Sequence, residues 1–262
     1  MAKKENNINI EDLFDQGLTK DQAKKSFNKA IQTVEDKGYQ KNLTKMFTYA
    51  SETGGDLFPK MSIKDKRSLL TQCDEYLNKW CKKYVNDRQN PALQRPLKNY
   101  GERDSALIER VATNTGMPKS TLNDYLIGHF IYMSAENMNG EILEEYLAEV
   151  LEPHGWIWCA GSTFRAIDFC YLEENNNILL QVKNKYNTEN SSSSAIRNGT
   201  EIKKWNRLTS PKKATGLDRP LPNWKTLIEL INAPDELAEM LSEEKYLEYI
   251  KNNSTKELDT LE

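Results

Sequence analysis

The sequence contains few of the residues from which several common catalytic sites are built. Its 262 residues include only two histidines, His129 and His154, which argues against a histidine base or a histidine-rich metal site. The four cysteines show no CxxC or other zinc-ligand spacing. We therefore expect Cys73, Cys81, Cys159 and Cys170 to be buried free thiols in a reducing compartment.

Long apolar runs are also missing. No stretch approaches the ~18 apolar residues of a transmembrane helix, and the polar first residues lack the apolar core of a signal peptide. These absences predict a cytoplasmic protein. Because 38% of the residues are hydrophobic and 29% are charged, we expect a globular protein with one large domain or two small ones.

Basic charge is concentrated in one segment. The formal net charge of −3 by itself argues against nucleic-acid binding. However, residues 181–225 hold ten Lys or Arg and three acids, whereas residues 229–262 hold ten acids and three lysines. A phosphate-binding surface needs such a local excess of positive charge. The alternative is a solvated surface loop.

Helical periodicity dominates the first half of the chain, and strand-forming residues follow it. Residues 1–135 read as mostly helical, and residues 136–151 as a further helix before Pro153 and Gly155. Three strands are then expected, the last two forming an antiparallel hairpin. They cover residues 156–160, 166–172 and 178–183.

The remaining elements complete an expected α/β (α+β) protein, with a mixed sheet flanked by helices over residues 136–262. A basic helix is predicted over residues 195–208 and another helix over 234–251, while 224–231 fits either a strand or a helix. In the first half, residues 105–126 resemble a DNA-binding helix-turn-helix with Gly116 at its turn. The alternative is a pair of packed scaffold helices.

Three polar residues stand out within the expected hairpin. Asp168 is flanked by Ile167 and Phe169, while Gln181 and Lys183 are two residues apart and share one face of their strand. A carboxylate and an ammonium among apolar neighbours are costly unless each has a partner. The two residues could form a structural ion pair, or they could bind a hydrated Mg²⁺ and a phosphate between them.

These residue types suit phosphodiester hydrolysis. Asp168 would be the central metal ligand, and Gln181 would offer its amide oxygen where other enzymes use an acid. Lys183 would orient and help to deprotonate the attacking water and would stabilise the charge that develops on phosphorus.

Asp168 and the Gln181-Val182-Lys183 run, behind a glutamate-bearing helix, resemble the core of PD-(D/E)xK nucleases. The resemblance implies a restriction-endonuclease-like fold and a metal-binding acid on that helix. The helix spacing resembles that of archaeal Holliday-junction resolvases, which favours Glu144 over Glu145. The sequence departs from the pattern because Ile167 replaces the usual proline and Gln181 replaces an acid, which leaves the number of metal ions open.

A more local resemblance covers residues 136–230. The stretches Trp158–Phe169 and Leu180–Asn187, together with the serine-rich segment that leads to Lys203, Lys204 and Trp205, resemble SinI-type type II restriction endonucleases. This resemblance implies a homodimer that cuts GGWCC or GGNCC in double-stranded DNA, leaves 5′ overhangs and works beside a cognate DNA methyltransferase.

Two groups of residues are expected to contact DNA. The segment 184–225 is rich in side chains that hydrogen-bond bases or phosphates, and Arg197 or Arg207 would suit guanine. The second group lies at the start of the second helix of the predicted helix-turn-helix, at residues 119–123. The expected contacts are Lys185, Asn187, Ser192, Arg197, Lys203, Lys204, Arg207, Lys119, Ser120, Thr121 and Asn123.

Two other functions remain open at this point. A structure-specific repair or junction nuclease would use the same catalytic residues on branched DNA. A non-catalytic regulator would bind DNA through residues 105–126 and keep residues 140–183 as a degenerate core.

Overall fold

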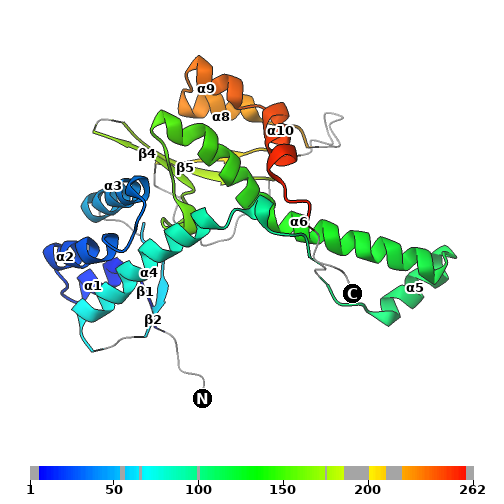
Figure 1. Cartoon of the computed structure of the whole chain (residues 1–262), viewed down its shortest axis with the longest axis horizontal. Coiled ribbons are helices and arrows are strands. Elements are labelled where there is room, and N and C mark those ends of the chain that lie inside the picture. Colours follow the sequence, from blue (N-terminus) through cyan, green and yellow to red (C-terminus); the bar gives the residue numbers. More distant parts are fainter. Residues whose placement is uncertain are drawn as a thin grey trace. The chain divides into compact units, whose positions relative to one another are not determined.

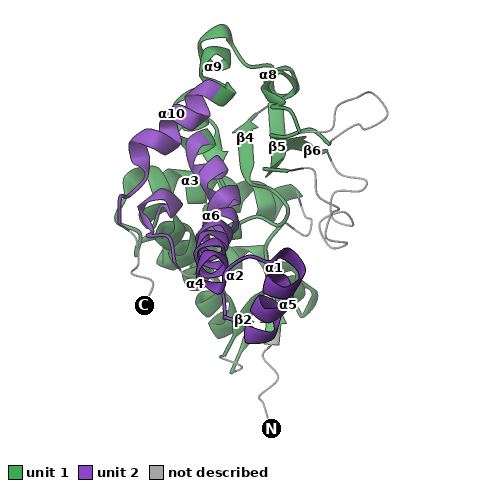
Figure 2. Ribbon diagram, turned by 90° about the vertical axis from the view of Figure 1, so that its right-hand side faces the viewer, with its two compact units in different colours: residues 1–90, 147–243 green, residues 91–146, 244–262 purple. Residues whose placement is uncertain are grey.

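A computed structural model describes residues 6–53, 57–64, 67–98, 101–174, 176–185, 201–210 and 220–257 of the chain (Figure 1). The chain forms two compact units (Figure 2). Unit 1 contains residues 1–90 and 147–243, and unit 2 contains residues 91–146 and 244–262. The predicted boundary between residues 135 and 136 falls inside one long helix, α6 (Lys119–Leu151).

Helices make up most of the described chain, and short strands join them. The elements that begin in unit 1 are β1 (Asn6–Ile8), α1 (Ile10–Asp15), α2 (Lys20–Ile31), α3 (Lys37–Thr53), β2 (Met61–Ile63), α4 (Leu69–Gln89), η2 (Glu152–His154), β3 (Ile157–Trp158), η3 (Ala160–Ser162), β4 (Phe169–Glu173), β5 (Asn176–Lys183), β6 (Ile202–Asn206), α8 (Trp224–Ile231), α9 (Asp235–Met240) and α10 (Glu243–Asn253). Those that begin in unit 2 are η1 (Ala92–Gln94), α5 (Ser105–Thr115) and α6.

A four-stranded mixed sheet forms the centre of unit 1, in the order β3-β4-β5-β6. β4 pairs with β3 and β5 in antiparallel fashion, whereas β6 runs parallel to β5. The expected hairpin is therefore present, with Phe169 opposite Leu180. A mixed sheet flanked by helices confirms the predicted fold class and is consistent with a restriction-endonuclease-like core.

The basic helix predicted over residues 195–208 is wrong where the structure describes it, because residues 202–206 form strand β6. Ile202 and Trp205 are three residues apart and both are buried, which imitates a helical period. In a strand this spacing puts them on opposite faces. Both are nevertheless buried, because helices cover both faces of the sheet.

The two faces of the sheet meet different helices. On one face, Tyr171, Ile178 and Lys203 lie against residues of α8 and of the turn into α9. On the other face, Leu172 and Asn177 lie beside α3 at the hairpin end of the sheet. Trp205 packs against Trp224 of α8 with ring centroids 5.1 Å apart, which fixes β6 to this helix. Residues 224–231, which fitted either element, thus form a helix.

The N-terminal helices pack around an aromatic cluster. Phe27 of α2 stacks on Phe47 of α3 at 4.2 Å, and both Phe27 and Phe58 meet Trp80 of α4 edge-on. Local sequence sets where these helices begin. Ser68 caps α4 through a reciprocal pair of hydrogen bonds with Thr71, which satisfies backbone donors that the first turn leaves open.

Unit 2 contains the expected helix-turn-helix segment in a modified form. α5 ends at Gly116, whose φ of +69° favours glycine, and α6 begins three residues later. This second helix, α6, is 33 residues long. It contains both the helix predicted over residues 119–126 and the helix predicted over residues 136–151, which form one continuous helix. Residues 234–251, predicted as one helix, form α9 and α10 instead.

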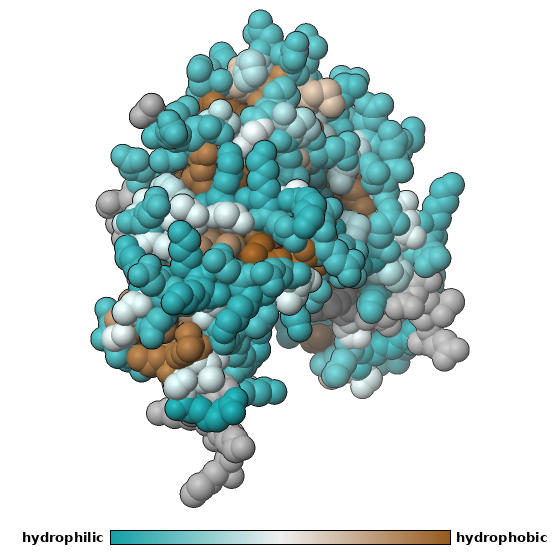
Figure 3. Space-filling view, turned by 60° about the vertical axis from the view of Figure 1, so that its left-hand side comes forward, coloured by the Kyte–Doolittle hydropathy of each residue, from teal (hydrophilic) through white to brown (hydrophobic). Residues whose placement is uncertain are grey.

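Hydrophilic residues predominate on the face that Figure 3 shows, and apolar residues emerge there in separate patches. In the described ranges, no helix combines the length and the apolar character needed to cross a membrane.

All four cysteines are free and buried, as the sequence predicted. Burial raises the pKa of the Cys73 thiol to about 11 and that of Cys81 to about 12. Because the thiolate is the reactive form, we expect native protein to react with a thiol reagent such as DTNB far more slowly than unfolded protein. Rapid labelling of any thiol before unfolding would contradict this arrangement.

Candidate active site

Helix α4 positions the loop that leads into Asp168. The indole N–H of Trp80 donates a 2.8 Å hydrogen bond to the carbonyl of Thr163, and the backbone N–H of Arg165 donates to the carbonyl of Leu57 at 2.8 Å. Gly161 lies so close to α4 that a Cβ there would be 2.8 Å from the backbone oxygen of Lys83. Its φ of +69° also favours glycine. The approach to Asp168 is therefore fixed by packing.

Asp168 is held on both sides by the sheet. Its N–H donates to the carbonyl of Leu180 at 2.9 Å, and its carbonyl accepts from the N–H of Cys159 at 2.8 Å. Its carboxylate oxygen Oδ2 accepts the backbone N–H of Val182 at 2.6 Å. Because Val182 lies between Gln181 and Lys183, this bond holds the carboxylate beside both predicted site residues.

Gln181 and Lys183 share one face of β5 but differ in exposure. The side chain of Gln181 is buried, at 1% exposed, whereas Lys183 reaches solvent at the end of the strand. Leu180 and Val182 are buried on the opposite face. The shared face of Gln181 and Lys183 is the arrangement that the sequence predicted, whereas the exposure of Lys183 differs from the ammonium among apolar neighbours that the sequence suggested.

Electrostatics connect Asp168 to Lys183. Burial raises the pKa of the Asp168 carboxyl, while the charge of Lys183 and the hydrogen bond from Val182 oppose this rise. The Lys183 ammonium is thus near enough to stabilise the carboxylate. The structure therefore brings Asp168, Gln181 and Lys183 together within unit 1.

The donor set of these residues fits a hard divalent cation. Mg²⁺ prefers oxygen ligands and is often held by one or two carboxylates together with substrate phosphates. Asp168 supplies a carboxylate that is costly to bury, and Gln181 supplies an amide oxygen. Among the described residues, no group of three or more His, Cys, Asp or Glu side chains is arranged so that it could hold a metal ion by itself. Water and a substrate phosphate could complete the coordination of such an ion.

The two helix glutamates differ in their surroundings within unit 2. Glu145 is buried, and its Oε1 accepts the N–H of Ala92 at 2.5 Å, so it caps the start of η1. Burial raises the pKa of this carboxyl. Glu144 is half-buried. These contacts give Glu145 a local structural role. That Glu144 is a metal-binding acid of the active site stays a prediction.

The predicted DNA-binding residues of β6 are separated by the sheet. Lys204 pairs with Gln181 and shares its face, whereas Lys203 lies on the opposite face and donates to the carbonyl of Leu230 at 3.0 Å. Arg207 is buried. Its guanidinium pairs with Glu243 and donates to the Asn184 side chain at 2.7 Å. Lys185 is exposed beyond the end of β5.

The other predicted contacts lie in unit 2 or outside the described residues. Lys119 and Ser120 are exposed at the start of α6, and Lys119 pairs with Glu109 at 2.5 Å. Thr121 and Asn123 are half-buried. The residues that the structure does not describe are Asn187, Ser192 and Arg197.

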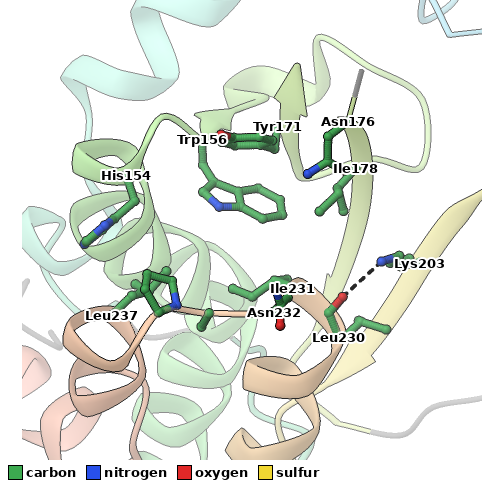
Figure 4. A pocket seen from close by; sticks show the side chains of 12 residues that line it. His154, Trp156, Tyr171, Asn176, Ile178, Lys203, Leu230, Ile231, Asn232 and Leu237 are labelled. Atoms are coloured by element: carbon green, nitrogen blue, oxygen red, sulfur yellow. Dashed lines mark hydrogen bonds between the residues drawn. The ribbon is translucent and has the colours of Figure 1, made fainter. Parts of the chain in front are cut away.

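Sequence reasoning missed a cavity on the face of the sheet opposite Gln181. It has a volume of about 460 Å³, and Trp156 and Tyr171 face it from one side while Ile231 and Asn232 face it from the other (Figure 4). Lys203 reaches its edge. No sequence signal pointed to the cavity, because its lining comes from the segment before β3, from β4, β5 and β6, and from α8, α9 and the turn between them, which only folding brings together.

Comparisons with known proteins agree with this geometry. The family model described as SinI restriction endonuclease matches residues 23–254 of the chain. The type II restriction enzyme Eco47I of Escherichia coli is 50% identical over 127 residues, which are 47% of this chain and 50% of that enzyme. The type II restriction enzyme SinI of Salmonella infantis is 42% identical over 139 residues, 52% and 55% of the two chains. The chain thus matches about half the length of each relative.

Arg207 offers a test of structural against DNA-reading function. Breaking a buried ion pair leaves an uncompensated charge, so we expect Arg207→Ala to lower the free energy of unfolding by about 3 kcal/mol, measured by urea denaturation. Lys225→Ala is the control. It removes an exposed 3.8 Å pair with Glu229 and should cost less than about 0.5 kcal/mol. Loss of specific DNA binding with unchanged stability would instead make Arg207 a base reader.

Proposed function

Because the chain belongs to the SinI restriction endonuclease family, we propose that it is a type II restriction endonuclease that hydrolyses double-stranded DNA with Mg²⁺. The observation that supports this most directly is the hydrogen bond from the Val182 N–H to the Asp168 carboxylate, because Val182 separates the buried Gln181 from the exposed Lys183 along β5. These are the groups that metal-assisted phosphodiester hydrolysis requires.

Each residue has a distinct task in this proposal. Asp168, with Gln181 and Glu144, would hold the divalent ion, which when bound polarises the phosphate and makes water a better nucleophile. Lys183 presents its ammonium where the scissile phosphate would lie and stabilises the negative charge that grows there. The hydrogen bond from Val182 keeps Asp168 oriented, so little rearrangement is needed when DNA arrives.

The substrate would be a short interrupted palindrome such as GGNCC or GGWCC, as the family resemblance implies. Lys185 follows the end of β5 that carries Lys183, and Lys204 of β6 lies beside Gln181, which suits both lysines for phosphate contacts. Asn187, Ser192 and Arg197 follow directly along the chain and would read bases. Lys203 and Arg207 would support this surface from behind, because their side chains make internal contacts.

A palindromic site has two equivalent halves, which favours a homodimer with twofold symmetry. Unit 2 carries apolar side chains that suit such an interface. Among the described residues, five of the nine exposed large apolar side chains lie on α5, on α6 or in the turn between them. They are Leu107, Val111, Met117, Tyr125 and Tyr132, between 40% and 67% exposed. Exposed apolar residues clustered in this way often mark a protein interface.

We place the enzyme in the cytoplasm, where free thiols such as its four cysteines remain reduced. A cognate DNA methyltransferase would protect the host genome at the same site, as a functional rather than a physical partner.

The activity is tested by incubating the purified protein with plasmid DNA and Mg²⁺. We expect discrete fragments, with none when EDTA removes the metal. Asp168→Ala and Lys183→Ala should each lower the cleavage rate by at least about 1000-fold, because each removes a group that contacts the metal or the reacting phosphate. DNA binding, measured by gel shift with Ca²⁺, should survive in both variants.

The neighbouring glutamates provide a matched pair for the same assay. Glu144→Gln should be severely impaired, whereas Glu145→Gln should cut at nearly the wild-type rate because the amide can still accept the Ala92 N–H. Cutting confined to branched DNA would instead identify a junction nuclease. Binding without any cutting would indicate a regulator that acts through α5 and α6.

The oligomeric state tests the proposed dimer surface. Leu107→Glu with Tyr125→Glu should convert a dimer into single chains at micromolar concentration, because the charges oppose burial of this surface. Sedimentation velocity measures the mass of each species. Lys119→Ala with Asn123→Ala is the control and should remain dimeric. If the control loses DNA binding while the glutamate variant stays dimeric, the helix pair binds DNA instead.

A further inference from the structure

Strand β6 places an unassigned polar residue next to Lys183. The parallel register pairs Lys183 with Asn206 and Gln181 with Lys204. Paired residues of adjacent parallel strands project to the same face, and the strands are about 4.8 Å apart. Asn206 therefore belongs to the face that carries Gln181 and Lys183.

The neighbours of Asn206 confirm the direction of its side chain. Trp205 is buried on the opposite face, against Trp224 of α8. Because strand side chains alternate, Asn206 points away from α8 and toward the Lys183 face. Its backbone is well held, since its carbonyl accepts from the Asn223 side chain at 3.3 Å and the Arg207 N–H donates to the Lys183 carbonyl at 2.8 Å.

The amide oxygen of Asn206 lacks an expected partner. Oδ1 is buried, and it accepts no hydrogen bond from any residue that the structure describes. Buried polar atoms are nearly always paired, so an unpaired acceptor beside a catalytic strand calls for a donor.

The side chain of Lys183 supplies suitable donors. Its ammonium has three N–H groups and no acceptor, and it makes no ion pair or hydrogen bond with the described part of the chain. Lys204, the other cation on this face, already interacts with another residue. Lys183 acts on Asp168 through its charge but makes no hydrogen bond with a described residue, and it therefore occupies a position matched to an unpaired acceptor on the adjacent strand.

We propose that Asn206 is a positioning residue of the active site: a rotation of the exposed Lys183 side chain lets its ammonium donate to the unpaired Oδ1 of Asn206, which aims the ammonium at the scissile phosphate. The inference rests on the proposed nuclease function. Where an acid at position 181 would orient the lysine by its charge, Gln181 is neutral. Asn206 orients the ammonium from the adjacent strand instead, without neutralising the charge that the phosphate needs.

Kinetics distinguish positioning from a structural role. Asn206→Ala should slow single-turnover cleavage by about 10- to 100-fold at saturating Mg²⁺ while DNA affinity, KM and melting temperature stay at wild-type values. Asn206→Asp keeps an acceptor at the same place but offsets the ammonium charge, so its rate should lie between those of Asn206→Ala and the wild type. Asn177→Ala, on the same face at the far end of β5, is the matched control and should cut normally.

Three kinetic outcomes would overturn the proposal. Wild-type cleavage by Asn206→Ala would make the amide dispensable. A loss of DNA affinity or of folding without a change in turnover would assign it to binding or to stability. If Asn206→Asp lowers the Mg²⁺ concentration for half-maximal rate and excess Mg²⁺ rescues Asn206→Ala, the residue is a metal ligand.

A spectroscopic measurement tests the contact without relying on cleavage. Lysine ¹⁵N-ammonium signals become visible by NMR when hydrogen bonding slows proton exchange, and Lys183→Arg identifies the signal of interest. We expect this signal in wild type and in Asn206→Asp but not in Asn206→Ala. If the wild type cuts no DNA, the proposed function fails while this signal still decides the contact. Its absence from the wild type would refute the contact.

Discussion

The hydrogen bond between the Asp168 carboxylate and the Val182 N–H is the contact on which the site depends. A carboxylate among apolar residues is expensive to bury, and the raised pKa of Asp168 reflects that cost. The bond offsets part of the cost and fixes the acid to the strand that carries Gln181 and Lys183. Substrate and metal would then meet a charge that is already oriented, as electrostatic catalysis requires.

The rest of unit 1 keeps this contact in place. Trp80 of α4 holds the loop before Asp168, and the Arg207 N–H, which donates to the Lys183 carbonyl, holds the end of β6 beside β5. The same strand ends bring Asn206 level with Lys183. A site built on strand ends retains its geometry through packing.

Charge along the chain has two different uses in the folded protein. Within residues 181–225, Lys204 shares the face of Gln181, whereas Arg207 lies inside and neutralises Glu243, an acid from the segment 229–262. Some of the opposite charges of the basic and acidic segments therefore neutralise each other inside the protein. Only the basic side chains that remain exposed can attract phosphate.

The sequence alone predicted the hairpin and the common face of Gln181 and Lys183, because the alternation of strand side chains is local. It also pointed to Asp168 beside them, because a charged residue among apolar neighbours demands a partner. It failed at β6, where Ile202 and Trp205 imitate a helix, since only a sheet covered on both faces buries both. It also could not rank Lys203 against Lys204 or find Asn206. Those distinctions come from the register of β6 beside β5, which tertiary packing decides.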